Sequence, residues 1–89
     1  MKTDKTFKVY TRPTCHYCQL AINLLRDSGA DFTARSIDGC PGILREVRRS
    51  HNWETVPIIF ETSGGRDKFI GGFSDLQEYL SSGKQLLRG

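Results

Sequence analysis

Two cysteines, Cys15 and Cys18, stand three positions apart in the stretch 11–18 (TRPTCHYC). A close pair of thiols can exchange a disulfide, or it can supply half of a metal site. A zinc ribbon needs a second such pair or paired histidines, and the remaining candidates, Cys40 and His51, are isolated and far apart in the sequence. The spacing therefore favours redox chemistry and predicts no metal ligands.

The predicted elements on either side of the pair give the two thiols different environments. The alternating run at 7–10 predicts a strand, and apolar residues at helical spacing from Tyr17 onward predict a helix that closes at 28–29. Cys15 then lies in the first turn, where unpaired N–H groups and the positive end of the helix dipole stabilise a thiolate. Cys18 lies one turn further in, where we expect a drier, protonated thiol. The pair is predicted to be an exposed nucleophile with a resolving thiol behind it.

The rest of the chain continues the alternation of strands and helices. Further strands are predicted at 32–37, 56–60 and 68–70, with helices at 41–50 and after Ser74, which is expected to cap the last one. The order is β-α-β-α-β-β-α. A β-α-β start implies parallel strands, and the hairpin through 62–67 adds an antiparallel edge. The sequence predicts one α/β domain over 1–89, with a four-stranded mixed sheet flanked by three or more helices.

Composition narrows the classes of partner. The net charge is +3 and the 13 Lys and Arg residues are spread along the 89-residue chain, which argues against nucleic-acid binding. No apolar run approaches the ~20 residues of a membrane span, and the polar start shows no secretory signal. Three cysteines do not suggest a secreted disulfide framework, so a reducing compartment fits best. We expect a cytoplasmic monomer that binds neither nucleic acid nor membrane.

Four sequence blocks together resemble the glutaredoxin family over nearly the whole chain. They are Val9-Tyr10-Thr11-Arg12-Pro13 leading to Cys15-His16-Tyr17-Cys18, then Thr55-Val56-Pro57, Gly71-Gly72 and Phe73-Ser74-Asp75-Leu76. Their joint order and spacing are far more specific than any one block. The resemblance implies a thioredoxin-like fold and the reduction of protein disulfides and glutathione mixed disulfides, with glutathione as co-substrate. The implied partners are glutathione and proteins that are glutathionylated or carry disulfides.

The resemblance also implies a groove for glutathione, lined by residues from three parts of the chain. They are Arg12, Tyr17, Thr55, Val56, Pro57, Gly72, Phe73, Ser74 and Asp75. Segment 55–57 resembles the family segment with a cis proline, which aims the N–H and C=O of Val56 at the tripeptide. Arg12 stands where the family usually carries Lys, and a guanidinium suits the glycyl carboxylate. The N–H groups of 73–75 offer a further carboxylate site, which leaves the Asp75 side chain for the ligand amine.

Two departures from the family pattern leave alternatives open. His16 replaces the usual Pro, which restores a backbone N–H near the sulfur. Loss of that Pro also resembles family members that hold a [2Fe–2S] cluster between two subunits, and 52–55, with Trp53, faintly resembles the tryptophan segment of single-cysteine members. A cluster-binding dimer is therefore one alternative. A dedicated electron donor to a reductase such as ribonucleotide reductase is another. Cys40 has no counterpart in the four blocks, and we expect an unremarkable thiol there.

Overall fold

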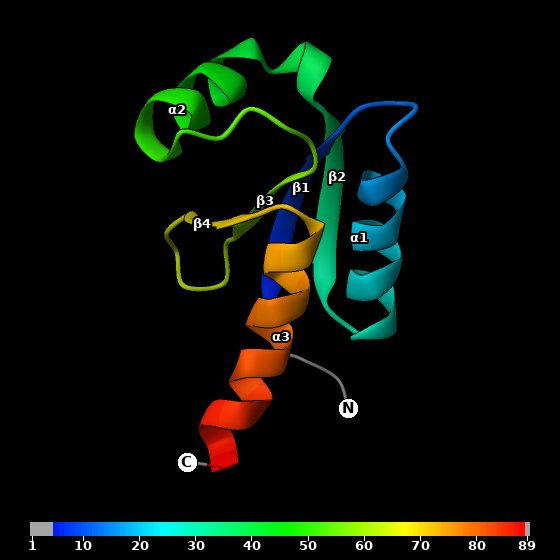
Figure 1. The fold of residues 1–89 in the computed structure, drawn as a ribbon, viewed down its shortest axis with the longest axis vertical. Coiled ribbons are helices and arrows are strands. Elements are labelled where there is room, and N and C mark those ends of the chain that lie inside the picture. Colours follow the sequence, from blue (N-terminus) through cyan, green and yellow to red (C-terminus); the bar gives the residue numbers. More distant parts are fainter. Residues whose placement is uncertain (1–4, 89) are drawn as a thin grey trace.

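The computed structural model describes residues 5–88, with side chains for residues 5–81. Its elements are β1 (Thr6–Thr11), α1 (His16–Asp27), β2 (Asp31–Ser36), η1 (Ile37–Gly39), α2 (Pro41–His51), β3 (Ile58–Glu61), β4 (Lys68–Gly71) and α3 (Phe73–Arg88). The strands form one sheet in the order β2-β1-β3-β4, in which only the β1–β2 pair is parallel (Figure 1). The predicted element order and the mixed four-stranded sheet are confirmed.

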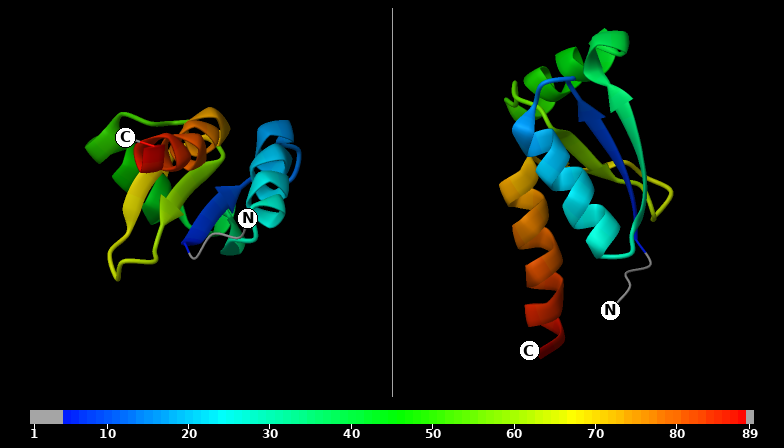
Figure 2. Two further views of the ribbon diagram at one scale, coloured as in Figure 1. Left: turned by 90° about the horizontal axis from the view of Figure 1, so that it is seen from below. Right: turned by 90° about the vertical axis from the view of Figure 1, so that its right-hand side faces the viewer.

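Helices cover both faces of this sheet. α1 and α3 lie side by side on one face and α2 lies on the other (Figures 1 and 2). The alternation along β1 shows why: Val9 packs in a cluster with Leu25 of α1 and Leu76 of α3, whereas the next residue, Tyr10, packs in a cluster with Val47 of α2. Successive side chains of a strand point to opposite faces, so each strand supplies both layers of the core. β1 ends at Thr11, and the short loop 12–14 leads from its carboxyl end to Cys15.

Most strand ends differ from the prediction by one or two residues, and two of these differences have a clear local cause. β2 ends at Ser36, and Ile37 begins the short 3₁₀ turn η1, because the Ser36 hydroxyl accepts a hydrogen bond from the Asp38 N–H at 3.2 Å. β3 begins at Ile58 rather than at Val56. The Val56–Pro57 peptide bond is cis, and a proline has no N–H to give to a β-ladder. Val56 and Pro57 therefore belong to the loop that faces the cysteine pair.

The predicted cap of the last helix is wrong. α3 begins at Phe73, so Ser74 lies inside its first turn instead of ahead of it. The Asp75 side chain accepts the hydrogen bond from the Gly72 N–H at 3.0 Å and closes the helix start. A carboxylate in the first turn also favours the positive end of the helix dipole. This hydrogen bond holds the Asp75 carboxylate at the turn between β4 and α3.

Candidate active site

The sulfur of Cys15 caps helix α1. Cys15 has an extended backbone (φ −92°, ψ 112°), and its Sγ accepts a hydrogen bond from the Cys18 N–H at 3.2 Å. The predicted place of Cys15 at the helix start is confirmed. Sγ also lies 3.6 Å from the Val56 carbonyl oxygen, to which a thiol can donate. The sulfur therefore meets an N–H donor and the positive end of the helix dipole.

Cys18 lies one turn further along α1 and is only 3% exposed. Burial, assisted by the hydrogen bond with Cys15, raises the pKa of the Cys18 thiol to about 12. Burial acts in this direction because the apolar surroundings disfavour the charged thiolate. The drier environment expected for Cys18 is confirmed, while its role in catalysis stays a prediction.

The raised pKa of Cys18 predicts how the stability of the reduced protein depends on pH. Between the ordinary value of 9 and about 12, the unfolded chain releases this proton while the folded chain keeps it. The free energy of unfolding should therefore be insensitive to Cys18 below about pH 9 and fall above it, by up to about 1.4 kcal/mol per pH unit. Urea denaturation under reducing conditions from pH 8 upward, with Cys18→Ala as the comparison, measures this slope. If the free energies of unfolding of the two proteins fell equally with pH, the raised pKa of Cys18 would be contradicted.

A groove of about 410 Å³ lies beside the Cys15 sulfur. It is lined by Tyr17, Trp53, Thr55, Val56, Pro57, Gly72, Phe73, Ser74 and Asp75. These residues come from the start of α1, the loop before β3 and the start of α3, three segments that only the tertiary fold brings together. All of the predicted binding residues except Arg12 therefore line one groove, and Val56 connects that groove to the Cys15 sulfur.

The rim next to Cys15 is aromatic. Tyr17 is 58% exposed, and its ring lies 6.2 Å from that of Phe73 and 5.8 Å from that of His16. An exposed tyrosine ring presents a flat apolar surface with a polar hydroxyl at its tip. The arrangement fits a groove wall against which the stem of a bound peptide can pack.

Arg12 is the predicted binding residue that the structure does not bring into the groove. Its Nε lies 3.6 Å from Oδ1 of Asp38 in η1, and both side chains are largely exposed. The pair uses the Nε side of the guanidinium and leaves the two terminal nitrogens outside this contact. A long exposed side chain can change rotamer at little cost, so the predicted role in carboxylate binding stays a prediction.

Asp75 serves the fold and faces the groove at the same time. Its Oδ2 accepts the Gly72 N–H, and it lies so close to Gly71 that a Cβ on that residue would be 2.5 Å away. Gly71 has a φ of +123°, a conformation that residues with a side chain rarely adopt. One carboxylate oxygen therefore holds the β4–α3 turn, and the other can receive a cationic ligand group.

Trp53 lines the groove but was not among the predicted binding residues. Its side chain is half-buried. Its indole N–H also donates a hydrogen bond to the Thr55 carbonyl at 2.8 Å. The only signal in the sequence was an aromatic residue two positions before the 55–57 segment, which by itself does not specify this bond.

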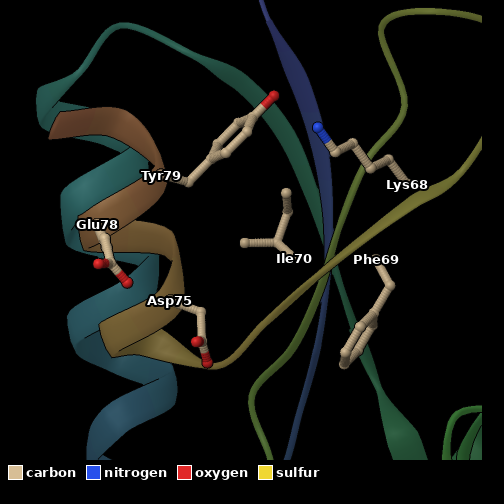
Figure 3. Close-up of a pocket in the computed structure, with 6 residues that line it drawn as sticks. All are labelled: Lys68, Phe69, Ile70, Asp75, Glu78 and Tyr79. Carbon is tan, nitrogen blue, oxygen red and sulfur yellow. The ribbon is translucent and has the colours of Figure 1, made fainter. Parts of the chain in front are cut away.

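A second, smaller hollow of about 300 Å³ lies between β4 and α3, away from the cysteines. Lys68, Phe69, Ile70, Asp75, Glu78 and Tyr79 line it (Figure 3). Ile70 points toward α3 and Phe69 to the opposite side of β4, while the Lys68 ammonium lies 5.0 Å from the centre of the Tyr79 ring. The larger groove is the one whose lining residue Val56 lies against the Cys15 sulfur, at 3.6 Å, so we place the candidate active site there.

Cys40 lies outside the groove. It is half-buried at the start of α2, makes no side-chain hydrogen bond to cap that helix, and packs beside the apolar cluster on the α2 face. Within the part of the chain that the structure describes, no three His, Cys, Asp or Glu side chains converge as metal ligands. None of the helices between residues 5 and 88 has the length and apolar character needed to cross a membrane.

Comparison with known proteins shows what the chain is similar to. The sequence profile of the glutaredoxin family matches residues 7–65. A glutaredoxin of Pseudomonas aeruginosa is 34% identical over 76 residues, which cover 85% of this chain and 86% of that protein. A hybrid peroxiredoxin of Haemophilus influenzae is also 34% identical over 80 residues, 90% of this chain, but the chain spans only 31% of that longer protein.

Solved structures show the same fold. The solution structure of a dithiolic glutaredoxin from Trypanosoma brucei brucei superposes with a TM-score of 0.73 at 32% identity, covering 90% of this chain and 81% of that one. The crystal structure of a buckwheat glutaredoxin–glutathione complex gives a TM-score of 0.73 at 26% identity, with 92% and 74% covered. The thioredoxin-like arrangement predicted for the chain is thereby confirmed.

Proposed function

The chain belongs to the glutaredoxin family of thiol–disulfide oxidoreductases, and from this premise we propose that it reduces glutathione mixed disulfides and protein disulfides with glutathione as the electron source. The observation that carries the proposal is the position of the helix-capping Cys15 sulfur, 3.6 Å from the Val56 carbonyl at the edge of the groove. The buckwheat relative in complex with glutathione supports the choice of ligand.

The groove offers complementary groups to each part of the tripeptide. Val56 lies in a loop outside β3, so its backbone is available to pair with the ligand as a short antiparallel strand. The N–H groups at the start of α3 attract a carboxylate, and the Asp75 side chain attracts the α-amine. Arg12 can supply a second carboxylate contact once its side chain turns from Asp38 toward the groove.

The proposed reaction is two successive thiol–disulfide exchanges. The Cys15 thiolate attacks the glutathionyl sulfur of a mixed disulfide, the S–S bond breaks, and the substrate thiolate leaves and takes up a proton. Cys15 is now joined to glutathione. A second glutathione thiolate attacks the glutathionyl sulfur of that adduct, restores the Cys15 thiolate and forms oxidised glutathione. Each turnover consumes one free glutathione, the other half of the oxidised glutathione being the group removed from the substrate, so this route needs only one protein cysteine.

Cys18 is predicted to be dispensable for this route. Burial raises the pKa of the Cys18 thiol above its ordinary value, so little of it is thiolate at pH 7 and glutathione should resolve the adduct. Cys18→Ser should therefore keep at least about half of the native rate on a glutathionylated peptide, because it leaves the Cys15 cap and the groove in place. Glutathione-coupled kinetics measure the rate, and Cys40→Ser provides the matched control. A loss of tenfold or more in Cys18→Ser alone would show that the dithiol route dominates.

The reducing system separates this function from the donor alternative. We expect turnover with glutathione and glutathione reductase, and none with thioredoxin reductase. The reverse preference would favour a dedicated donor to another reductase. A brown protein after anaerobic reconstitution, losing its visible absorbance when glutathione is removed, would favour the cluster-bridged dimer. We propose that the protein acts in a reducing compartment such as the cytoplasm, where thiols persist.

A further inference from the structure

Trp53 lies where the two walls of the groove meet. It is the single tryptophan of the chain and is half-buried, with its indole N–H donating to the Thr55 carbonyl at 2.8 Å. Thr55 begins the wall formed by 55–57. The hydrogen bond therefore ties the indole ring to the wall that presents Val56.

The same ring touches the opposite wall. A Cβ placed on Gly72 would lie 3.0 Å from Cζ2 of Trp53, so the indole packs directly against the turn that begins α3. The Phe69 ring of β4 meets Trp53 edge-on, with ring centres 5.7 Å apart. Trp53 is thus held by β4 and contacts both walls, which come from distant parts of the sequence.

The hydrogen bond to Thr55 also fixes the direction of the Val56 N–H. The Thr55 carbonyl and the Val56 N–H belong to one planar peptide group, and in a trans peptide they point in opposite directions. The 55–56 peptide is trans, since the cis bond is the one that follows it. When the indole N–H holds the Thr55 carbonyl, the Val56 N–H is turned away from the indole and is kept in one orientation.

We propose that Trp53 is a positioning residue for the glutathionyl group: it sets the separation of the two groove walls and orients the Val56 N–H that pairs with the ligand backbone. The inference rests on the proposed function. Trp53 does not contact the reacting sulfurs, so its loss should weaken recognition of the glutathionyl group and leave the reactivity of Cys15 intact.

The test uses Trp53→Phe, which keeps ring packing but lacks the N–H donor, and Trp53→Leu, which removes the ring. One cysteine peptide is prepared as two mixed disulfides, one with glutathione and one with free cysteine, so that the leaving peptide thiolate is the same in both. For the glutathionyl peptide, Trp53→Phe should raise KM about 5–10-fold with kcat within about twofold, and Trp53→Leu should raise KM further. The cysteinyl peptide and the rate at which iodoacetamide alkylates Cys15 should not change.

Tyr79→Phe is the matched control. It also removes one hydrogen-bond donor from an aromatic ring, because the Tyr79 hydroxyl bonds Glu61 at 2.5 Å, but Tyr79 lies outside the groove. Its kinetics should equal those of the native protein.

Three outcomes would overturn the inference. An unchanged KM in both Trp53 variants would show that Trp53 does not position the ligand. Equal losses on both disulfides, or slower alkylation of Cys15, would show that it only supports the fold. A native protein that reduces neither disulfide with glutathione would remove the proposed function and this role with it, a result visible before any variant is made.

Discussion

Replacement of Cys15 by serine should abolish the reduction of glutathione mixed disulfides, lowering the rate by at least about 10³-fold. A hydroxyl at neutral pH is a far weaker nucleophile than a thiolate, and Cys15 is the cysteine at the helix start whose sulfur meets the groove. The fold should survive, because serine is a favoured N-cap and its hydroxyl can accept the Cys18 N–H in place of the sulfur. The measurement is the initial rate on a glutathionylated peptide at saturating glutathione.

The control for this variant is its stability. Urea denaturation of Cys15→Ser should give a free energy of unfolding within about 1 kcal/mol of the native value, so lost activity cannot be attributed to unfolding. Cys40→Ser, which changes a thiol outside the groove, should keep native activity. Substantial turnover by Cys15→Ser would mean that another group performs the attack.

The second large effect is expected from Gly71→Ala. Gly71 has a φ of +123°, and a Cβ there would lie 2.5 Å from Oδ2 and 2.9 Å from Cβ of Asp75. The Asp75 carboxylate cannot easily retreat, because it holds the Gly72 N–H. The substitution should lower the free energy of unfolding by about 2–4 kcal/mol and should also raise the KM for a glutathionylated peptide, since the start of α3 forms one groove wall.

Gly64→Ala is the matched control for Gly71→Ala. Gly64 lies in the hairpin between β3 and β4, where a Cβ would meet no atom within 4 Å and the backbone has no unusual φ. Its free energy of unfolding should stay within about 0.5 kcal/mol of the native value. Equal stability of the two variants in urea would contradict the conformation assigned to the β4–α3 turn.

Local patterns were enough to predict the architecture. Period-two and helical spacing gave the order of the elements, and the place of Cys15 at a helix start followed from the strand before it and the apolar periodicity after it. The ends of helices and strands were predicted less accurately, because hydrogen bonds of single side chains determine where an element starts or stops. The Ser36 hydroxyl ended β2 before Ile37, and Asp75 took the capping role assigned to Ser74.

The groove could not be predicted from the periodicity of the sequence alone. Its walls come from segments far apart in the sequence, and the resemblance to glutaredoxins brought them together before the structure did. The position of the Arg12 guanidinium could not be predicted in this way, because the rotamer of an exposed side chain depends on neighbours such as Asp38. Trp53 was not predicted as a groove residue because its hydrogen bond to Thr55 and its contact with Gly72 exist only in the folded chain.

The most direct test of the account compares two disulfides of one peptide with the native protein. The groove is proposed to recognise the whole glutathionyl group through the Val56 backbone, the start of α3 and the Asp75 carboxylate. With glutathione as reductant, the glutathionyl peptide should be reduced at least about 100-fold more efficiently, in kcat/KM, than the cysteinyl peptide, which lacks the γ-glutamyl and glycyl groups. Equal efficiencies would show that Cys15 reacts without help from the groove and would contradict the account.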